Sequence, residues 1–186
     1  MNRFILILLI CSLTSFAATA QEEKEVVPPT AQAEWLTKWN NSKAYTLEAL
    51  QLIPDSSLAY RPTDEQMSVQ EQIQHISGNV YGLSRRFLDH DPEDFDEEAL
   101  RASLSADTLA REELTRLVTD AYDFGAKAVE TLTEERWEEE VTNFFAGPKS
   151  RRVIVYLLQD HATHHRAQVL IYMRLLGLTP PRYRGW

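Results

Sequence analysis

Four long stretches of the sequence repeat apolar side chains every three to five residues, the spacing that one face of an α-helix requires. They run from Ala31 to about Ile53, from Ser68 to just before Asp89, from about Ser105 to Thr131 and from Ser150 to Leu176. No alternation of the kind that a strand requires extends over a useful length. Each amphipathic helix must bury its apolar stripe against another, so the sequence predicts an all-α fold, a four-helix bundle.

The ends of these helices carry recognisable signals. Pro54-Asp55 ends the first helix, and Ser68-Val69-Gln70-Glu71 forms a capping box at the start of the second. Gly177, with Pro180-Pro181 just beyond, ends the last helix. The connections between the helices are long for simple hairpins, so at least one of them is expected to cross or cover an end of the bundle.

The first 20 residues have the pattern of a secretory signal peptide. A short basic start is followed by an apolar core and by Ala18-Thr19-Ala20, which predicts cleavage before Gln21. The apolar run is too short for a permanent membrane span. An uncleaved anchor, or a lipoprotein signal that uses Cys11, is the alternative. We therefore expect residues 1–20 to be a signal peptide, 21–30 a linker and 31–186 the bundle, in a bacterial protein exported to the periplasm or beyond.

Cleavage also limits the chemistry. Cys11 is the only cysteine, so the mature chain would have no thiol, and a metal site would have to use His, Asp or Glu. Residues 1–20 contain Arg3 and no acidic residue. Their removal therefore changes the net charge from −9 to −10. An acidic chain without a basic cluster is a poor partner for nucleic acid or for an anionic membrane surface.

Three of the five histidines fall within the nine residues from Asp160 to Gln168. His161 and His165 are four positions apart on a helix, so they share a face, and that face belongs to the stripe expected to point to the core. His164 falls on its edge. Two imidazoles at this spacing can hold one divalent metal ion, although a pair alone makes a weak site.

His75 is the best third ligand among the remaining histidines. It lies on a polar flank of the second helix, where it can turn toward a neighbour, whereas His90 lies in an acidic connection and is expected to be exposed. Three imidazoles suit a first-row transition metal and leave coordination positions open for water or substrate. The alternative is that these histidines are hydrogen-bonded core residues without a metal.

The last helix closely resembles the signature of the DinB/YfiT-like superfamily. The resemblance lies in His161 to Gly177 and the proline pair after it, with Ala167 where the family often has glycine, and the segment Ser68 to Ile76 is similar as well. It implies a four-helix bundle with a metal held by His75, His161 and His165. From the imidazole ligands we expect a divalent transition metal, zinc first and nickel or iron as alternatives. His164 matches a position outside the ligand set. Characterised members include zinc-dependent S-transferases and isomerases that use small thiols such as bacillithiol, mycothiol or glutathione.

We therefore expect an exported metal-dependent enzyme that acts on a small molecule, of the thiol S-transferase or hydrolase type. Export argues against the thiol reaction, because those thiols are mainly cytosolic. The alternative is a non-catalytic metal-binding or dimerising bundle of the cell envelope, and a homodimer stays open. The acidic segment 89–98 lacks the ligand pattern of a calcium loop and is expected to be a solvated connection.

Overall fold

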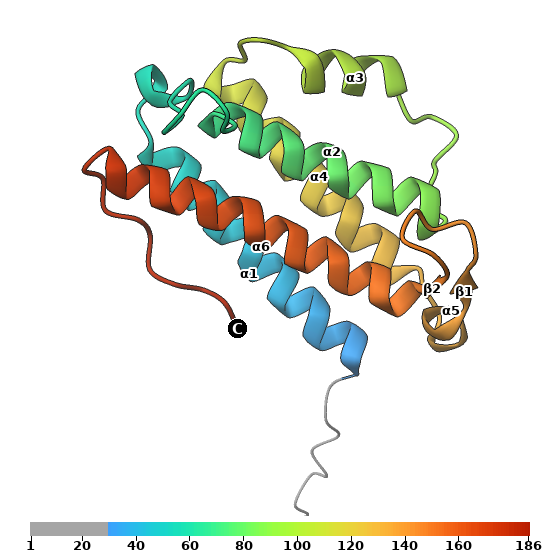
Figure 1. The fold of residues 1–186 in the computed structure, drawn as a ribbon. Coiled ribbons are helices and arrows are strands. Elements are labelled where there is room, and N and C mark those ends of the chain that lie inside the picture. Colours follow the sequence, from blue (N-terminus) through green and yellow to red (C-terminus); the bar gives the residue numbers. More distant parts are fainter. Residues whose placement is uncertain (1–29) are drawn as a thin grey trace, which may run out of the picture.

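The computed structural model describes residues 30–186, so the predicted signal peptide and nearly all of the predicted linker lie outside the described residues. The elements are α1 (Ala31–Leu52), a 3-10 turn η1 (Asp55–Ser57), α2 (Val69–Phe87), α3 (Glu97–Ser105), α4 (Arg111–Glu130), α5 (Glu134–Glu138), β1 (Glu140–Val141), β2 (Lys149–Ser150) and α6 (Arg151–Leu175). The long helices α1, α2, α4 and α6 pack as a bundle (Figure 1), which confirms the predicted fold class.

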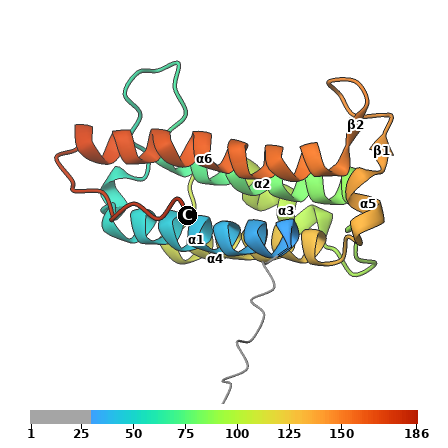
Figure 2. The same ribbon diagram turned by 90° about the horizontal axis from the view of Figure 1, so that it is seen from below.

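The four long helices form two layers. α2 and α6 lie in one layer and α1 and α4 in the other (Figure 2). The main contacts join α2 to α4 and α6, and α1 to α4 and α6. Helices α1 and α2 follow each other in the chain but lie diagonally across the bundle, so the connection between them has to pass over one end. The side-by-side packing of α2 with α6 brings two distant parts of the sequence together.

The centre of the bundle combines apolar packing with hydrogen bonds. The indole of Trp39 donates to the carbonyl oxygen of Tyr122 at 2.8 Å, and the Tyr122 hydroxyl lies 3.0 Å from the hydroxyl oxygens of both Ser42 and Thr46. Gly125 allows the close approach of α4 to α1 and α2, because a Cβ there would lie 2.8 Å from a methyl carbon of Val80. These contacts fix the position of α4 against its neighbours.

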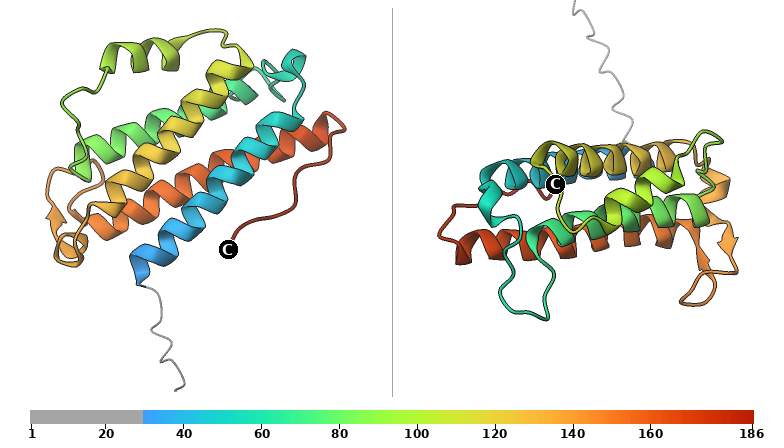
Figure 3. Two further views of the ribbon diagram at one scale, coloured as in Figure 1. Left: turned by 180° about the vertical axis from the view of Figure 1, so that it is seen from behind. Right: turned by 90° about the horizontal axis from the view of Figure 1, so that it is seen from above.

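The third long helix begins later than predicted. The sequence predicted one helix from about Ser105 to Thr131, but α3 ends at Ser105 and α4 begins at Arg111. Side chains of α2 explain the break: Gln70 and Gln74 donate to backbone carbonyls at residues 103–107, and Gln70 Oε1 accepts from the N–H of Leu109. Because the N–H of Leu109 bonds to Gln70, it is not available for the helical hydrogen bond to the carbonyl of Ser105. α3 lies outside the bundle (Figure 3) and has no fully buried residue.

Two connections differ from the sequence prediction. The stretch from Trp137 to Ser150, in which the sequence shows no strand pattern, contains the end of α5 and both strands of a short antiparallel pair, in which Val141 faces Lys149. The acidic segment 89–98 is more than a solvated connection, because the carboxylate of Asp89 pairs with Arg136 and with the buried Arg151. No helix among residues 30–186 is long and apolar enough to cross a membrane.

Candidate metal centre

Three imidazoles meet where α2 packs against α6. His75 comes from α2, and His161 and His165 come from successive turns of α6. The ring centres are 4.9 Å apart for His75 and His161, and 4.4 Å apart for the other two pairs. One ring nitrogen from each residue lies within 4.8 Å of the others. The structure thus brings together the three residues that the sequence selected, and metal binding by them stays a prediction.

The cluster lies at the surface of the bundle rather than in its core. His165 is 8% exposed, whereas His161 is half-buried and His75 is exposed. The prediction that His161 lies inside the core-facing stripe is wrong: the neighbouring Ala162 is fully buried, while Leu175, on the same side of α6 as His161, is 60% exposed. The buried face of α6 is therefore centred to one side of His161. As a consequence, the cluster opens to solvent.

A buried amide orients His165. The Oε1 atom of Gln72 lies 2.6 Å from Nδ1 of His165, and its Nε2 donates to Gln168 Oε1 at 2.8 Å and to the Tyr172 hydroxyl at 3.2 Å. Because the amide nitrogen of Gln72 is used for these two acceptors, its oxygen faces the imidazole and accepts from Nδ1–H. This arrangement leaves Nε2 of His165 with its lone pair free for a metal ion.

All three histidines favour the neutral form. Burial, together with a smaller effect of the neighbouring imidazoles, lowers the pKa of His161 and that of His165 to about 4. Burial also lowers the pKa of His75, with a smaller effect from His164. Neutral imidazole is the form that binds a metal ion, so no proton has to be displaced from these rings near pH 7.

The cluster fits a divalent metal after a small adjustment. Nitrogen atoms bound to zinc at the usual distance in a tetrahedral site lie about 3.3 Å apart. The three ring nitrogens lie within 4.8 Å of one another, so they would have to move closer together to bind one ion. The His75 side chain is the most exposed of the three and is therefore the least confined. Three imidazoles suit zinc, nickel or iron, and they leave at least one coordination position open.

The remaining histidines lie outside the cluster. His164 is exposed, and its Nε2 lies 3.0 Å from Nε2 of Gln168. Gln168 also contacts the cluster indirectly, because its Oε1 accepts from Nε2 of Gln72 at 2.8 Å. His90 was expected to be exposed, but it is half-buried against the ring of Phe124, with ring centres 4.5 Å apart.

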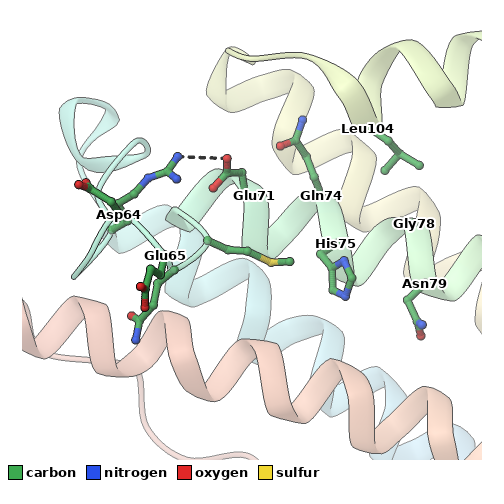
Figure 4. A pocket seen from close by; sticks show the side chains of 11 residues that line it. Asp64, Glu65, Glu71, Gln74, His75, Gly78, Asn79 and Leu104 are labelled. Carbon is green, nitrogen blue, oxygen red and sulfur yellow. Dashed lines mark hydrogen bonds and ion pairs between the residues drawn. The ribbon is translucent and has the colours of Figure 1, made fainter.

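A pocket of about 540 Å³ opens beside His75. One wall is α2, with His75 and Asn79, and the opposite wall is the loop between α1 and α2, with Asp64 and Glu65 (Figure 4). Leu104 of α3 covers one side. A small molecule in this pocket would therefore lie next to the open side of the histidine cluster.

The fold and the cluster define a four-helix bundle with a candidate histidine metal site, and the comparison with known proteins gives its family. Residues 24–185 match the DinB family, so the chain belongs to the DinB family. It is 23% identical to the YjoA protein of Bacillus subtilis over 136 residues, which are 72% of this chain and 83% of YjoA.

Solved structures have the same fold. The crystal structure of YjoA superposes with a TM-score of 0.64 at 20% identity, covering 81% of this chain and 97% of YjoA. A DinB-like protein of Bacillus cereus gives a TM-score of 0.65 at 18% identity, covering 80% and 95% of the two chains. YfiT of Bacillus subtilis gives 0.63 at 19% identity, covering 84% and 93%, and is described as a probable metal-dependent hydrolase with an unusual four-helix bundle topology.

Proposed function

We propose that this DinB-family protein is a metal-dependent hydrolase that acts on a small molecule, with a divalent metal held by His75, His161 and His165. The observation that carries the proposal is the convergence of three neutral imidazoles from two helices beside a pocket that is open to solvent. The description of the structurally similar YfiT as a probable metal-dependent hydrolase supports it. Zinc is the first choice of metal, with nickel or iron as alternatives.

The residues of the chain have distinct tasks in this proposal. A divalent metal with an open position supplies an activated water molecule and polarises a carbonyl or phosphoryl group of the substrate. His165 is held in one orientation by Gln72, while the exposed His75 leaves the approach from the pocket free. The pocket wall of α2 and the loop opposite would hold the substrate. A thiol transfer at the same site is the related alternative.

We also propose that residues 1–20 direct export, which would place the enzyme in the periplasm or outside the cell. The support is the signal-peptide pattern of the sequence. Immunodetection in periplasmic and cytoplasmic fractions tests this point. A protein of full length that stays in the cytoplasm would contradict it and would make cytosolic thiols available as cosubstrates.

The deciding experiment is the metal content of the purified protein. We expect close to one zinc, nickel or iron ion per chain in the wild type and in His164→Ala, which changes a neighbouring histidine outside the cluster. The double variant His161→Ala, His165→Ala should contain almost none. Azide titration of the cobalt-substituted protein should then change its visible spectrum, because an open position accepts the ion. Equal, negligible metal in the wild type and the double variant would overturn the proposal.

A second candidate is a non-catalytic, dimerising bundle, and the outer face of α6 favours it. Val153 and Leu175 lie eleven positions before and after His164, and both are exposed. Leu157 and Ile171 lie seven positions before and after it. Such a stripe matches itself in an antiparallel pair of α6 helices from two copies. Light scattering should then show a dimer in the wild type and a monomer in Ile171→Glu; a wild-type monomer would exclude this candidate.

A further inference from the structure

The pocket beside the histidine cluster has an acidic loop wall. Asp64 and Glu65 lie in the exposed loop between α1 and α2, and no residue in the range 30–186 forms a hydrogen bond or an ion pair with either carboxylate. The only cationic side chain of the lining is Arg61, and it is 3.1 Å from Glu71 in an ion pair. The loop wall therefore presents two free negative charges and no free positive one.

The opposite wall carries an amide beside His75. Asn79 follows His75 by one turn of α2, and the two side chains point the same way (Figure 4). Its Oδ1 is buried and has no hydrogen-bond partner among the described residues. Gln74 has no free donor to offer, because its amide nitrogen bonds the carbonyls of Ser103 and Ala106 at 2.9 and 3.0 Å.

We infer that the substrate of this site carries a positively charged amino or guanidinium group. The inference rests on the proposed function: the reacting group would lie at the histidines, and the cationic group would lie at the loop wall that carries Asp64 and Glu65. Leu104 offers apolar contact to the part of the molecule between them. A carboxylate or phosphate in that position would lie next to two like charges without a free cation to pair with, which disfavours anionic substrates.

A matched series of hydroxamates tests the inference on the cobalt-substituted protein. The probes are 6-aminohexanoic, hexanoic and adipic monohydroxamate, which share the metal-binding head and the chain length but end in a cation, a methyl group and an anion. Binding is followed by the visible spectrum of cobalt. We expect the cationic probe to bind roughly tenfold more tightly than the neutral one, since two partly exposed charge contacts are worth about 1–2 kcal/mol together, and the anionic probe to bind most weakly.

The preference for the cationic probe should depend on the charges of Asp64 and Glu65 and not on charges elsewhere in the protein. Asp64→Asn with Glu65→Gln should bring the three affinities close together, as should high salt. Glu93→Gln with Asp94→Asn removes the same two charges from the connection between α2 and α3 and should leave the preference unchanged. Equal affinities in the wild type, or tighter binding of the anionic probe, would overturn the inference while leaving the metal site intact. A protein that takes up no cobalt, or binds cobalt but no hydroxamate, would overturn the proposed function and the inference with it.

Discussion

The amide oxygen of Gln72 lies 2.6 Å from Nδ1 of His165, across the contact between α2 and α6. Gln72 is itself 1% exposed and is held by Gln168 and by the hydroxyl of Tyr172. The orientation of one proposed metal ligand on α6 thus depends on a side chain of α2. Replacing a group that holds a ligating histidine commonly lowers metal affinity about 10- to 100-fold.

Replacing Gln72 should weaken metal binding without removing a ligand. In Gln72→Leu the Nδ1–H of His165 loses its acceptor, so the ring is no longer fixed, and we expect the Kd for zinc to rise about 10- to 100-fold. Gln72→Glu keeps an acceptor at the same position and should retain tight binding. Competition with a chromophoric chelator measures both. An unchanged Kd in a folded Gln72→Leu variant would show that the contact has no such role.

Metal should stabilise the fold. A ligand that binds only the native state at a thousand times its Kd adds about 4 kcal/mol, which for a chain of this size is roughly 8–16 °C in Tm. We expect zinc to raise the Tm of the wild type by this amount, a chelator to reverse the shift, and His75→Ala to show a much smaller one. Differential scanning fluorimetry is sufficient. A shift of equal size in His75→Ala would remove that residue from the ligand set.

The two helical glycines Gly125 and Gly82 should respond in opposite ways to alanine. A Cβ on Gly125 would lie 2.8 Å from a methyl carbon of Val80 and 3.1 Å from the ring of Trp39, so Gly125→Ala should destabilise by about 1–3 kcal/mol. A Cβ on Gly82 meets nothing within 4 Å, and Gly82→Ala should stabilise by about 0.5–1 kcal/mol. Urea unfolding of both variants checks the pair, and two changes of the same sign would contradict the packing described for α4.

The start of α2 should carry a pH-dependent contribution to stability. The backbone N–H of Ser68 lowers the pKa of Glu71 below its ordinary value of 4.5, and Arg61 adds to this effect. A lowered pKa means that the contribution is complete above about pH 4.5 and is lost as the pH falls through the folded-state value. Wild type should therefore exceed Glu71→Gln in urea stability at pH 7 by a margin that shrinks toward pH 3. If the difference in stability between the wild type and Glu71→Gln does not change with pH, the effect comes from the shape of the Glu71 side chain and not from its charge.

The sequence was informative where a helix has an apolar stripe and a clear cap. The capping box at Ser68 and the end of α6 near Gly177 are both present in the structure. The prediction was wrong between α2 and α4, where the sequence indicated one helix from about Ser105. The break there depends on hydrogen bonds from Gln70 and Gln74, which belong to another helix and are distant in the sequence. The prediction also missed the pairing of β1 with β2, since two-residue strands are too short to show alternation.

The three residues of the site could be predicted from the sequence, but their burial could not. Helical spacing joins His161 to His165, and the scarcity of other candidates selects His75. Which edge of the apolar stripe of α6 is buried depends on how α1 and α2 pack against it, so the half-buried position of His161 needed the structure. The bond from Gln72 to His165 spans 93 positions and leaves no trace in a single sequence.

Because α2 packs against α6, the proposed ion would also link these two helices. A metal bound to both helices closes a loop of nearly ninety residues between His75 and His165, in a chain whose single cysteine cannot form an internal disulfide. A cross-link that closes a loop of this length restricts the unfolded chain by several kcal/mol in the chain-entropy picture. Loading the ion would therefore cross-link α2 to α6, two helices far apart in the sequence, and losing it would remove the metal chemistry and this cross-link together.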